Sequence, residues 1–347
     1  MSNVSSEDRV RAIIKGDPTD RVAVFDFSEM VSTKLAGYLW EDVRYDAEKS
    51  ADAAIELNKK VKTDFVIAPV DANSSFIDLG LDVPLPEDDY GIVKSTYFTT
   101  REEIDSKDLP DPGDRDSYPC LYKGIIDKFH ALYRKYDDSG VVTIGEAWGP
   151  LTTAGFLRGV ERLLMDMYLE PDDADKVLKK TAPFVDGIFD AMLSEGGKCL
   201  LASDPTASGD LIGPEHFEKY SQPHLAKTIK KWKNKGKITM CHICGNTNHL
   251  AAEIAETGVD IFSVDWQVDL AQAKKDLGGV TLLGNLHPTD VVWKGTPELI
   301  MKESKRCIDA AGEGGKFILG CGCDTPRDTP LENIAAMTEA AEKYGKY

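Results

Sequence analysis

Eight short runs of apolar residues recur along the chain, and a helical pattern or a long loop follows each of them. The runs cover residues 22–27, 65–68, 141–145, 199–202, 238–242, 261–264, 281–284 and 317–319. Continuous apolar strands that alternate with helices are typical of a parallel sheet covered on both faces. Eight such units in 347 residues fit a (β/α)8 barrel better than an open sheet. We therefore predict an α/β fold, a single-domain TIM-type barrel over residues 1–347.

Apolar residues at helical spacing predict the helices between the runs. They cover residues 5–16, 46–61, 124–136, 151–195 with a break near 170–171, 214–235, 248–257, 270–277, 296–311 and 330–343. Residues 79–118 differ, because short β-prone pieces alternate there with Gly, Pro and an acidic run. We expect this segment to form a small β excursion, a surface hairpin followed by a polar loop. No glycine-rich dinucleotide fingerprint follows the first run, which disfavours a Rossmann fold.

Polar side chains gather directly after the C-terminal ends of the predicted strands. They are Glu146, Asp204, His242, Asp265, Asn285 and Cys323. In a barrel, these strand ends meet at one mouth, where barrel enzymes carry their chemistry. The sequence therefore predicts a functional site at that mouth, built from several strands.

A candidate metal site begins with His242, which ends one apolar run, and Cys244, which follows two residues later. Residues two apart on a strand point to the same face, so an imidazole and a thiolate can meet at one point. Two soft ligands suggest zinc or copper but do not complete a site. The third candidate is Cys323, with Cys321 as its nearest competitor. One His and two Cys ligands with an open fourth position are typical of catalytic zinc.

The chemistry of this ligand set favours thiols over water as substrates. Two thiolates and a neutral imidazole leave zinc formally neutral, which makes the site a poor activator of water. The same site is a good host for a substrate thiol, because metal coordination favours thiolate over thiol. Thiol alkylation is the reaction that such a site suits. A simpler interpretation stays open, since buried Cys is common in protein cores.

Other residues near the strand ends also have a structural and a functional interpretation. Asp204 could begin a turn before Pro205, and Asp265 could cap a helix. Trp148 and Trp266 could pack at the rim or form a platform for a flat ligand. Three further cysteines lie in or beside apolar patterns and are better explained as core residues: Cys120, Cys199 and Cys307.

Charge and patterning exclude several classes of partner. The net charge of −18, from 59 acidic and 41 basic residues, argues against nucleic acid or an anionic membrane, since both need a positive field. It does not exclude a local basic pocket for a small anion. No apolar run approaches the ~20 residues that span a bilayer. Residues 1–8 lack the basic and apolar parts of a signal peptide, so we expect a cytoplasmic protein.

Four blocks of the sequence resemble the uroporphyrinogen decarboxylase superfamily, and within it the methylcobalamin:coenzyme M methyltransferases. The blocks are residues 11–22, 204–217, 242–247 and 320–333, and the similarity runs nearly from end to end. The His-x-Cys pair with a distant Cys is the specific part of this resemblance. The other blocks identify only the superfamily. Spacing to residues 329–333 aligns the family's cysteine ligand with Cys323.

The resemblance implies a (β/α)8 barrel that holds a zinc ion through His242, Cys244 and Cys323. It implies a separate methyl-corrinoid (cobamide) protein as partner, and a methyl group that passes between cobalt and the sulfur of a small thiol such as coenzyme M. Six further residues near the strand ends are assigned to the predicted site. Asp204, Asp265 and Glu146 are expected to orient ligands or substrate, and the residues expected at the corrinoid are Trp148, Asn246 and Trp266.

Three alternatives stay open. Uroporphyrinogen decarboxylases carry arginines after the first strand, whereas residues 25–34 contain none. A decarboxylase, which would need an arginine-lined pocket and no metal, is therefore the second hypothesis. The others are a methyltransferase that demethylates a methoxy or methylamine-type donor onto a corrinoid protein, and a non-catalytic corrinoid- or tetrapyrrole-binding protein. The oligomeric state also stays open, with a homodimer as one option.

Overall fold

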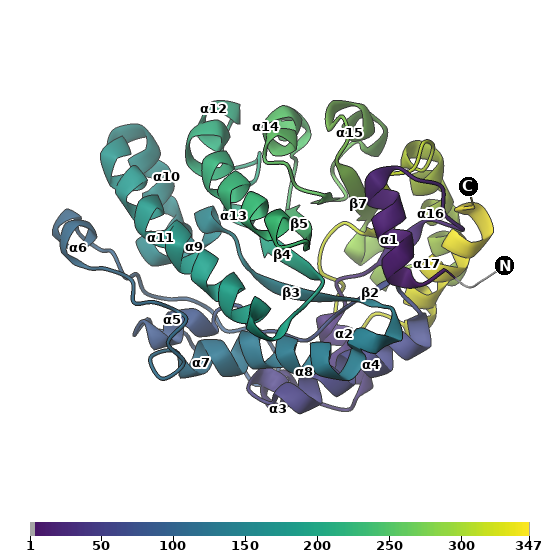
Figure 1. Ribbon diagram of the computed structural model, residues 1–347, viewed down its shortest axis with the longest axis horizontal. Coiled ribbons are helices and arrows are strands. Elements are labelled where there is room, and N and C mark those ends of the chain that lie inside the picture. The colour runs from purple at the N-terminus through teal and green to yellow at the C-terminus, as the bar shows by residue number, and fades with distance from the viewer. Residues whose placement is uncertain (1–3, 347) are drawn as a thin grey trace.

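The computed structural model describes residues 4–346, and within this range eight parallel strands form one sheet that is nearly closed into a barrel (Figure 1). The strands are β1 (Ala23–Phe25), β2 (Phe65–Ile67), β3 (Val142–Trp148), β4 (Cys199–Ser203), β5 (Ile238–Ile243), β6 (Ile261–Val264), β7 (Thr281–Leu286) and β8 (Phe317–Cys321). Their order is β1-β8-β7-β6-β5-β4-β3-β2. The predicted (β/α)8 barrel is confirmed.

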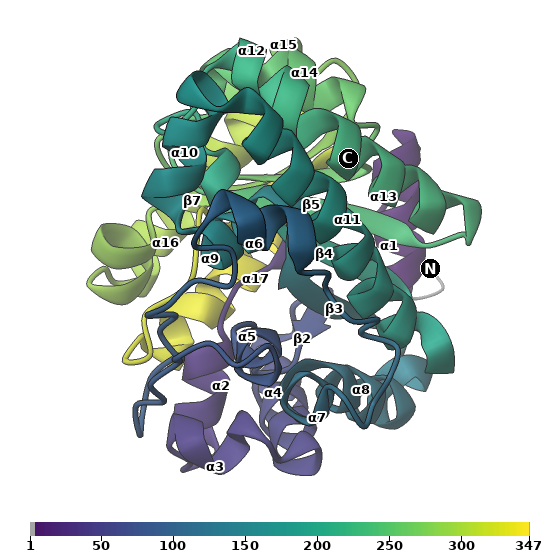
Figure 2. The same ribbon diagram turned by 90° about the vertical axis from the view of Figure 1, so that its left-hand side faces the viewer.

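Helices surround the sheet (Figure 2). They are α1 (Ser6–Lys15), α2 (Glu29–Leu35), α3 (Trp40–Arg44), α4 (Ala47–Val61), α5 (Ser74–Asp78), α6 (Arg101–Ser106), α7 (Pro119–Leu121), α8 (Asp127–Tyr136), α9 (Pro150–Arg158), α10 (Val160–Leu169), α11 (Pro171–Met192), α12 (Pro214–His216), α13 (Gln222–Asn234), α14 (Ala251–Glu256), α15 (Leu270–Asp276), α16 (Pro297–Ala311) and α17 (Leu331–Tyr344). The break predicted near residues 170–171 falls at the start of α11, where Pro171 suits the first turn. Across residues 4–346, no helix has the length and apolar character needed to cross a membrane.

Alternate strand residues belong to two different cores. Phe25, Met240 and Ile318 lie in the cluster that fills the barrel, together with Val10 and Ile13 of α1. Their neighbours along the strands pack outward against the helices instead; Val24, Cys241 and Leu319 are examples. This period of two follows from the pleat of a strand. It decides which residues near the strand ends can face the central cavity.

The predicted β excursion of residues 79–118 is not a regular hairpin. The N–H of Lys94 donates to the carbonyl of Asp82, and that of Ile92 donates to the carbonyl of Pro84, yet no strand forms in this fully described segment. Pro84 and Pro86 have no N–H groups, so this edge cannot continue a ladder. The insertion is therefore a loop that carries the short helix α6, and this part of the prediction was wrong.

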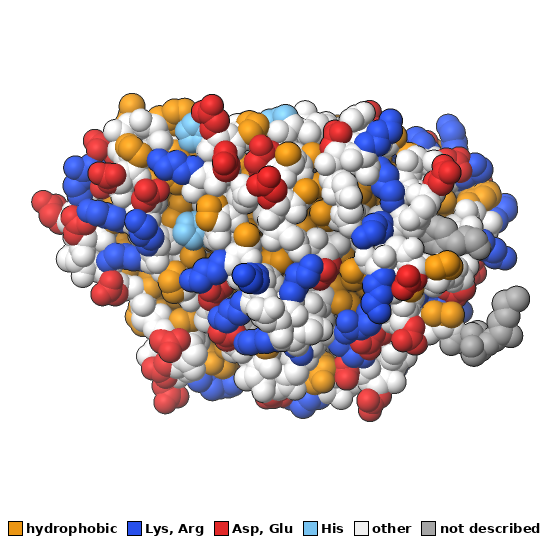
Figure 3. Space-filling view, turned by 45° about the horizontal axis from the view of Figure 1, so that its top comes forward, with side chains coloured by type: hydrophobic (Ala, Val, Ile, Leu, Met, Phe, Trp, Pro, Cys, Tyr) orange, Lys and Arg blue, Asp and Glu red, His pale blue; other side chains and the backbone are white. Residues whose placement is uncertain are grey.

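Acidic and basic side chains both occur across the face shown in Figure 3. The net charge of −18 therefore does not appear on that face as a surface of a single sign. Single-sign surfaces are the ones that steer charged polymers.

The seam between β1 and β2 is bridged by the buried side chain of Asp64. These strands are the two ends of the sheet. The N–H of Asp64 donates to the carbonyl of Val24 at 2.8 Å, and the N–H of Val24 donates to the carboxylate of Asp64 at 2.8 Å. The same carboxylate accepts hydrogen bonds from Arg9 Nη1 at 2.6 Å and from Arg21 Nη1 at 2.8 Å. One carboxylate thus connects α1, β1 and β2.

We expect Asp64→Asn to lower the free energy of unfolding by about 3–5 kcal/mol, because Arg21 would lose its buried counter-charge and Arg9 would keep only Asp20. Urea unfolding followed by circular dichroism measures this. The control is Asp309→Asn, which removes an exposed pair with Lys305 and should cost less than about 0.5 kcal/mol. Equally small losses in the two variants would contradict a bridging role for Asp64.

Candidate metal centre and adjoining pocket

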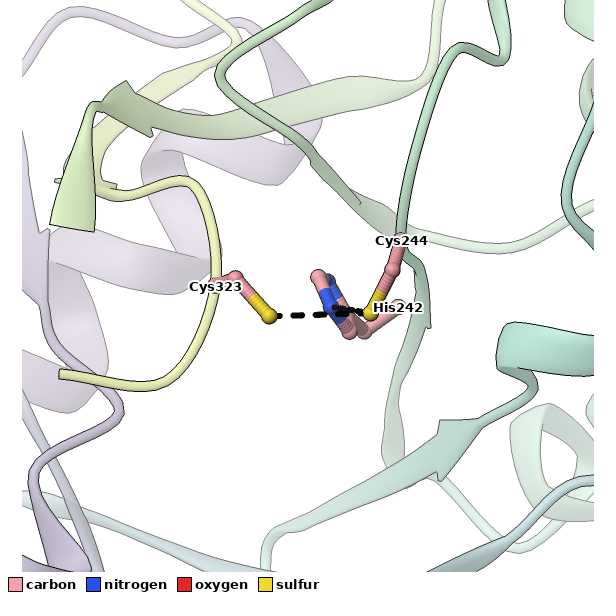
Figure 4. A group of neighbouring side chains, drawn as sticks. All are labelled: His242, Cys244 and Cys323. Carbon is pink, nitrogen blue, oxygen red and sulfur yellow. Dashed lines mark hydrogen bonds between the residues drawn. The ribbon is translucent and has the colours of Figure 1, made fainter. Parts of the chain in front are cut away.

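His242, Cys244 and Cys323 converge at the C-terminal mouth of the barrel (Figure 4). His242 lies in β5, Cys244 follows that strand directly, and Cys323 lies two residues beyond the end of β8. The Nε2 atom of His242 is 3.1 Å from the Cys244 Sγ, and the two sulfur atoms are 3.6 Å apart. All three potential donor atoms lie within 4.8 Å of one another. The structure therefore brings the predicted ligand trio together.

Cys321, the competing third ligand, lies on the other side of β8. Its side chain is fully buried in the outer core, with Sγ 3.6 Å from the carbonyl of Leu286. Cys323 reaches the mouth because the chain turns inward at Gly322. A Cβ at position 322 would stand 2.4 Å from the backbone nitrogen of Trp266, so the close approach requires glycine there.

The imidazole of His242 is oriented by its neighbours. Its Nδ1 atom lies 3.0 Å from the Oγ of Ser263, which is its register partner on β6. The ring of Phe27 packs against it, with centroids 5.1 Å apart. The bond to Ser263 directs Nε2 toward the two sulfurs, as the second ring nitrogen of a metal-binding histidine usually does.

The surroundings concentrate negative charge on the Cys323 sulfur. The hydrogen bond from Cys244 and then the proximity of His242 lower the pKa of Cys323 to about 4, against the opposing effect of burial. Burial alone would lower the pKa of His242, but the hydrogen bond and charge of Cys323 raise it. Metal ions bind the thiolate form of cysteine. Two sulfurs and one imidazole nitrogen, held on strand ends of a barrel, are a donor set that fits zinc.

A pocket of about 200 Å³ adjoins this cluster. Its lining residues are Glu29, Val70, Ala72, Asn73, Tyr90, Glu146, Trp148 and Asp324. Asp324 is the chain neighbour of Cys323, and the charges of Asp324 and Glu146 both act on His242. The metal centre and the pocket are therefore parts of one site.

Glu146 and Trp148 are the two predicted substrate and cofactor residues that line the pocket. Glu146, on β3, accepts a hydrogen bond from the Ser203 Oγ at 2.5 Å. Trp148, at the end of the same strand, donates its indole N–H to the Asn73 Oδ1 at 2.9 Å. Burial is the main cause that raises the pKa of Glu146.

Asp204 and Asp265 hold the backbone and do not line the pocket. The Asp204 carboxylate accepts the N–H of Thr152 at 2.6 Å near the start of α9, and burial raises its pKa to about 6. Asp265 accepts the N–H of Gly245 at 3.0 Å and that of Gln267 at 3.2 Å. Asp204 begins a turn, as its structural interpretation expected, whereas Asp265 caps no helix, because the N-cap of α15 is Asp269. Asp265 still serves the site indirectly, because Gly245 follows Cys244.

The remaining predicted residues, Asn246 and Trp266, lie outside the pocket on loops at the barrel mouth. The N–H of Asn246 donates to the Asp210 carboxylate at 3.0 Å. The Trp266 side chain is 44% exposed and packs against the ring of His287, with centroids 4.1 Å apart and ring planes inclined by 32°. Trp266 thus presents an exposed aromatic surface at the mouth.

Glu29 and Tyr90 are pocket residues that the sequence did not reveal. Glu29 begins α2 just after β1, is 5% exposed, and its Oε2 atom has no hydrogen-bond partner among the described residues. Its place after a strand end was a signal that could have found it. Tyr90 comes from the insertion, where no regular pattern assigns side chains to a face.

The three carboxyl groups of the pocket repel one another. Burial, and then the charges of Glu146 and Asp324, raise the pKa of Glu29 well above its usual range. Burial and the neighbouring Cys323 raise the pKa of Asp324 to about 7. The three carboxyl groups therefore favour their neutral forms, and a bound cation would favour their ionised forms.

Comparison with known proteins identifies relatives along the whole chain. Residues 5–344 match the family model described as uroporphyrinogen decarboxylase (URO-D). The chain is 29% identical over 351 residues to the methylcobamide:CoM methyltransferase MtbA of Methanosarcina mazei, and 27% identical over 356 residues to MtaA of Methanosarcina barkeri. Each alignment covers 99% of both proteins.

A solved structure, a methyltransferase from Methanosarcina mazei, superimposes with a TM-score of 0.86 at 21% identity over 99% of both chains. That likeness shows a shared barrel fold. The family model covers nearly all of this chain, including every strand of the barrel and all three residues of the ligand trio. The protein therefore belongs to the uroporphyrinogen decarboxylase (URO-D) family.

Proposed function

We propose that this protein is a zinc-dependent methyltransferase that moves a methyl group between a methyl-corrinoid protein and a small thiol. The observation that carries the proposal is the convergence of His242, Cys244 and Cys323 within 4.8 Å, next to a pocket. The relatives MtbA and MtaA support the reaction class, since their names give a methylcobamide and CoM as substrates.

His242, Cys244 and Cys323 would hold the zinc ion. When bound, zinc lowers the pKa of a thiol that enters its open position and so keeps that thiol as a thiolate. Ser263 orients the His242 ring through Nδ1, and Asp265 fixes the turn after Cys244 through the N–H of Gly245. These contacts hold the donor atoms in place before a substrate arrives.

The methyl transfer itself needs little covalent chemistry from the protein. The substrate thiolate attacks the methyl carbon in line with the cobalt–carbon bond. A sulfur–carbon bond forms, the cobalt–carbon bond breaks, and its electron pair stays on cobalt, which passes from Co(III) to Co(I). The thiol proton leaves to a carboxylate of the pocket, for which we propose Glu146. Catalysis is then mostly positioning of the two reactants.

The corrinoid is carried by a separate protein that docks over the barrel mouth. Trp266 supports this, because it is 44% exposed and packs against His287 at that mouth, with the two ring planes inclined by 32°. Exposed Trp is enriched at protein interfaces. We propose that Asn246 and Trp148 contact the cofactor from the rim and from the pocket. A homodimer and a cytoplasmic location stay predictions.

A decarboxylase is the second candidate, because the family bears that name. It would need basic side chains for the carboxylates of a tetrapyrrole. No Arg or Lys lines the described pocket, and three of its residues, Glu29, Glu146 and Asp324, are acidic. A polycarboxylate substrate would be repelled there, so the lining favours the methyltransferase.

Metal analysis tests the ligand set. Protein purified without chelator should contain about one zinc per chain, because two thiolates and an imidazole bind zinc tightly. Cys244→Ser and Cys323→Ser should lose it, whereas Cys321→Ser is the matched control and should keep it, since that sulfur faces the outer core. Zinc that survives Cys323→Ser but not Cys321→Ser would contradict the assignment.

Methyl transfer can be assayed with free methylcobalamin as donor and a panel of small thiols, under anoxic conditions. The cobalt–carbon absorbance should fall as methylated thiol accumulates. Cys244→Ser should slow the reaction about 100-fold or more, because the thiol loses its activating site. A metal-free protein that decarboxylates uroporphyrinogen, and methylates no thiol, would establish the second candidate instead.

Ser263→Ala tests the support of His242. Losing a hydrogen bond to the second nitrogen of a ligand histidine should weaken zinc binding about 10–100-fold. Competition with a coloured chelator measures the affinity. The control Ser106→Ala, at the exposed end of α6, should leave it unchanged. Equal zinc affinities in the two variants would show that Ser263 does not orient the imidazole ring of His242.

A further inference from the structure

The pocket beside the metal centre is acidic on three sides. Glu29 comes from the start of α2, Glu146 from β3, and Asp324 from the loop after β8. Because these carboxyl groups come from three separate elements, they do not belong to the polar, solvent-facing side of a single helix. The pocket lining contains no Lys or Arg among the described residues. Apart from His242 and a metal ion bound beside it, any counter-charge must therefore come from the molecule that binds.

Glu29 is the residue that most requires a ligand. Its side chain is 5% exposed, lines the pocket, and leaves Oε2 without a hydrogen-bond partner among the described residues. An ionised carboxylate that is buried without a partner costs several kcal/mol in general, so Glu29 can ionise at low cost only when a cation lies beside it. Glu146, in contrast, has the hydroxyl of Ser203. A group that donates hydrogen bonds and carries positive charge would satisfy Glu29.

The other polar groups of the pocket are already occupied. Asn73 donates its Nδ2 to the carbonyl of Gly91 at 2.7 Å and accepts the indole N–H of Trp148 with Oδ1. The pocket therefore offers acceptors, and it lacks the amide and guanidinium donors that bind a sulfonate or carboxylate. The hydroxyl of Tyr90 is the remaining donor of the described lining.

Basic residues nearby are committed elsewhere. Arg44 pairs with Asp71 at 3.1 Å and donates to the carbonyl of Asp89 at 2.9 Å. Lys128 is fully buried and donates to the carbonyl of Pro69 at 2.7 Å. Neither side chain lines the pocket. These cations do not neutralise the three carboxylates at the place where a substrate would sit.

Aromatic rings complete the walls. Tyr90 is held edge-on by Trp40, with centroids 4.5 Å apart, and Trp148 packs on Phe156 at 5.7 Å. Rings fixed in this way attract ammonium groups through their electron-rich faces. Carboxylates combined with aromatic rings are a typical lining for an organic cation.

We infer that the thiol substrate of this site is a small aminothiol, whose ammonium group binds among Glu29, Glu146 and Asp324, and not a thiol that carries a sulfonate or carboxylate. The inference rests on the proposed function and names its substrate class. The volume of about 200 Å³ limits the substrate to a few carbon atoms between sulfur and nitrogen. The relatives are named for CoM, an anionic thiol, so this pocket would set the chain apart from them.

Three thiols of equal chain length test the inference: 2-aminoethanethiol, 2-mercaptoethanol and 2-mercaptoethanesulfonate. With methylcobalamin as donor, kcat/KM should be highest for the ammonium compound, by about tenfold or more over the sulfonate. Glu29→Gln keeps the shape but removes one charge, and should reduce that ratio about tenfold. The control Asp309→Asn, exposed on α16, should leave the ratio unchanged.

Binding without chemistry gives an independent readout. Calorimetric titration with propylammonium should show binding that weakens in Glu29→Gln and in Glu146→Gln, whereas propanesulfonate should not bind. A preference for the sulfonate in both experiments would overturn the inference and leave the methyltransferase standing. Propylammonium binding without methylation of any thiol would overturn the proposed function alone. Methyl transfer from a methylated amine to cob(I)alamin, with aminothiols unreactive, would overturn the aminothiol assignment.

Discussion

The ring of parallel strands decides which side chains can meet at the barrel mouth. Along β5 and β8, alternate residues face the interior and the helices, so His242 follows Met240 into the centre while Cys321 follows Leu319 outward. Cys323 reaches His242 and Cys244 only because the backbone turns at Gly322, where a side chain would strike Trp266. The chemistry of the site therefore depends on strand parity and one close backbone approach.

The rest of the barrel keeps this arrangement in place. Asp64 bridges the seam between β1 and β2 at the opposite end, and Asp204 holds the start of α9 beside the pocket. Asp265 and Ser263 act nearer the centre, on the turn after Cys244 and on the His242 ring. Ser263 and Asp265 thus hold the donor residues in place, while Asp64 and Asp204 hold the scaffold around them. Preorganisation of this kind matters most where catalysis consists of positioning.

Much of this architecture could be predicted from the sequence, for physical reasons. Strands buried on both faces must be continuously apolar, so eight runs predicted eight strands. The candidate ligands His242, Cys244 and Cys323 could be predicted because residue types that bind metals occur at or just after the ends of predicted strands. The predicted hairpin does not form, because Pro84 and Pro86 have no N–H groups to donate hydrogen bonds to a neighbouring strand. The backbone contacts of Asp204 and the pocket position of Tyr90 could not be predicted from the sequence, because both depend on contacts between segments that lie far apart in the chain.

We propose that the acidic pocket gives the candidate metal centre its specificity. A thiol would enter beside three carboxyl groups, so its charge as well as its sulfur would determine whether it binds. X-ray absorption at the zinc edge tests the central claim most directly. The spectrum should show two sulfur ligands in the protein alone, from Cys244 and Cys323, and three after 2-aminoethanethiol is added. A sulfur count that does not change on addition of any thiol would contradict the account.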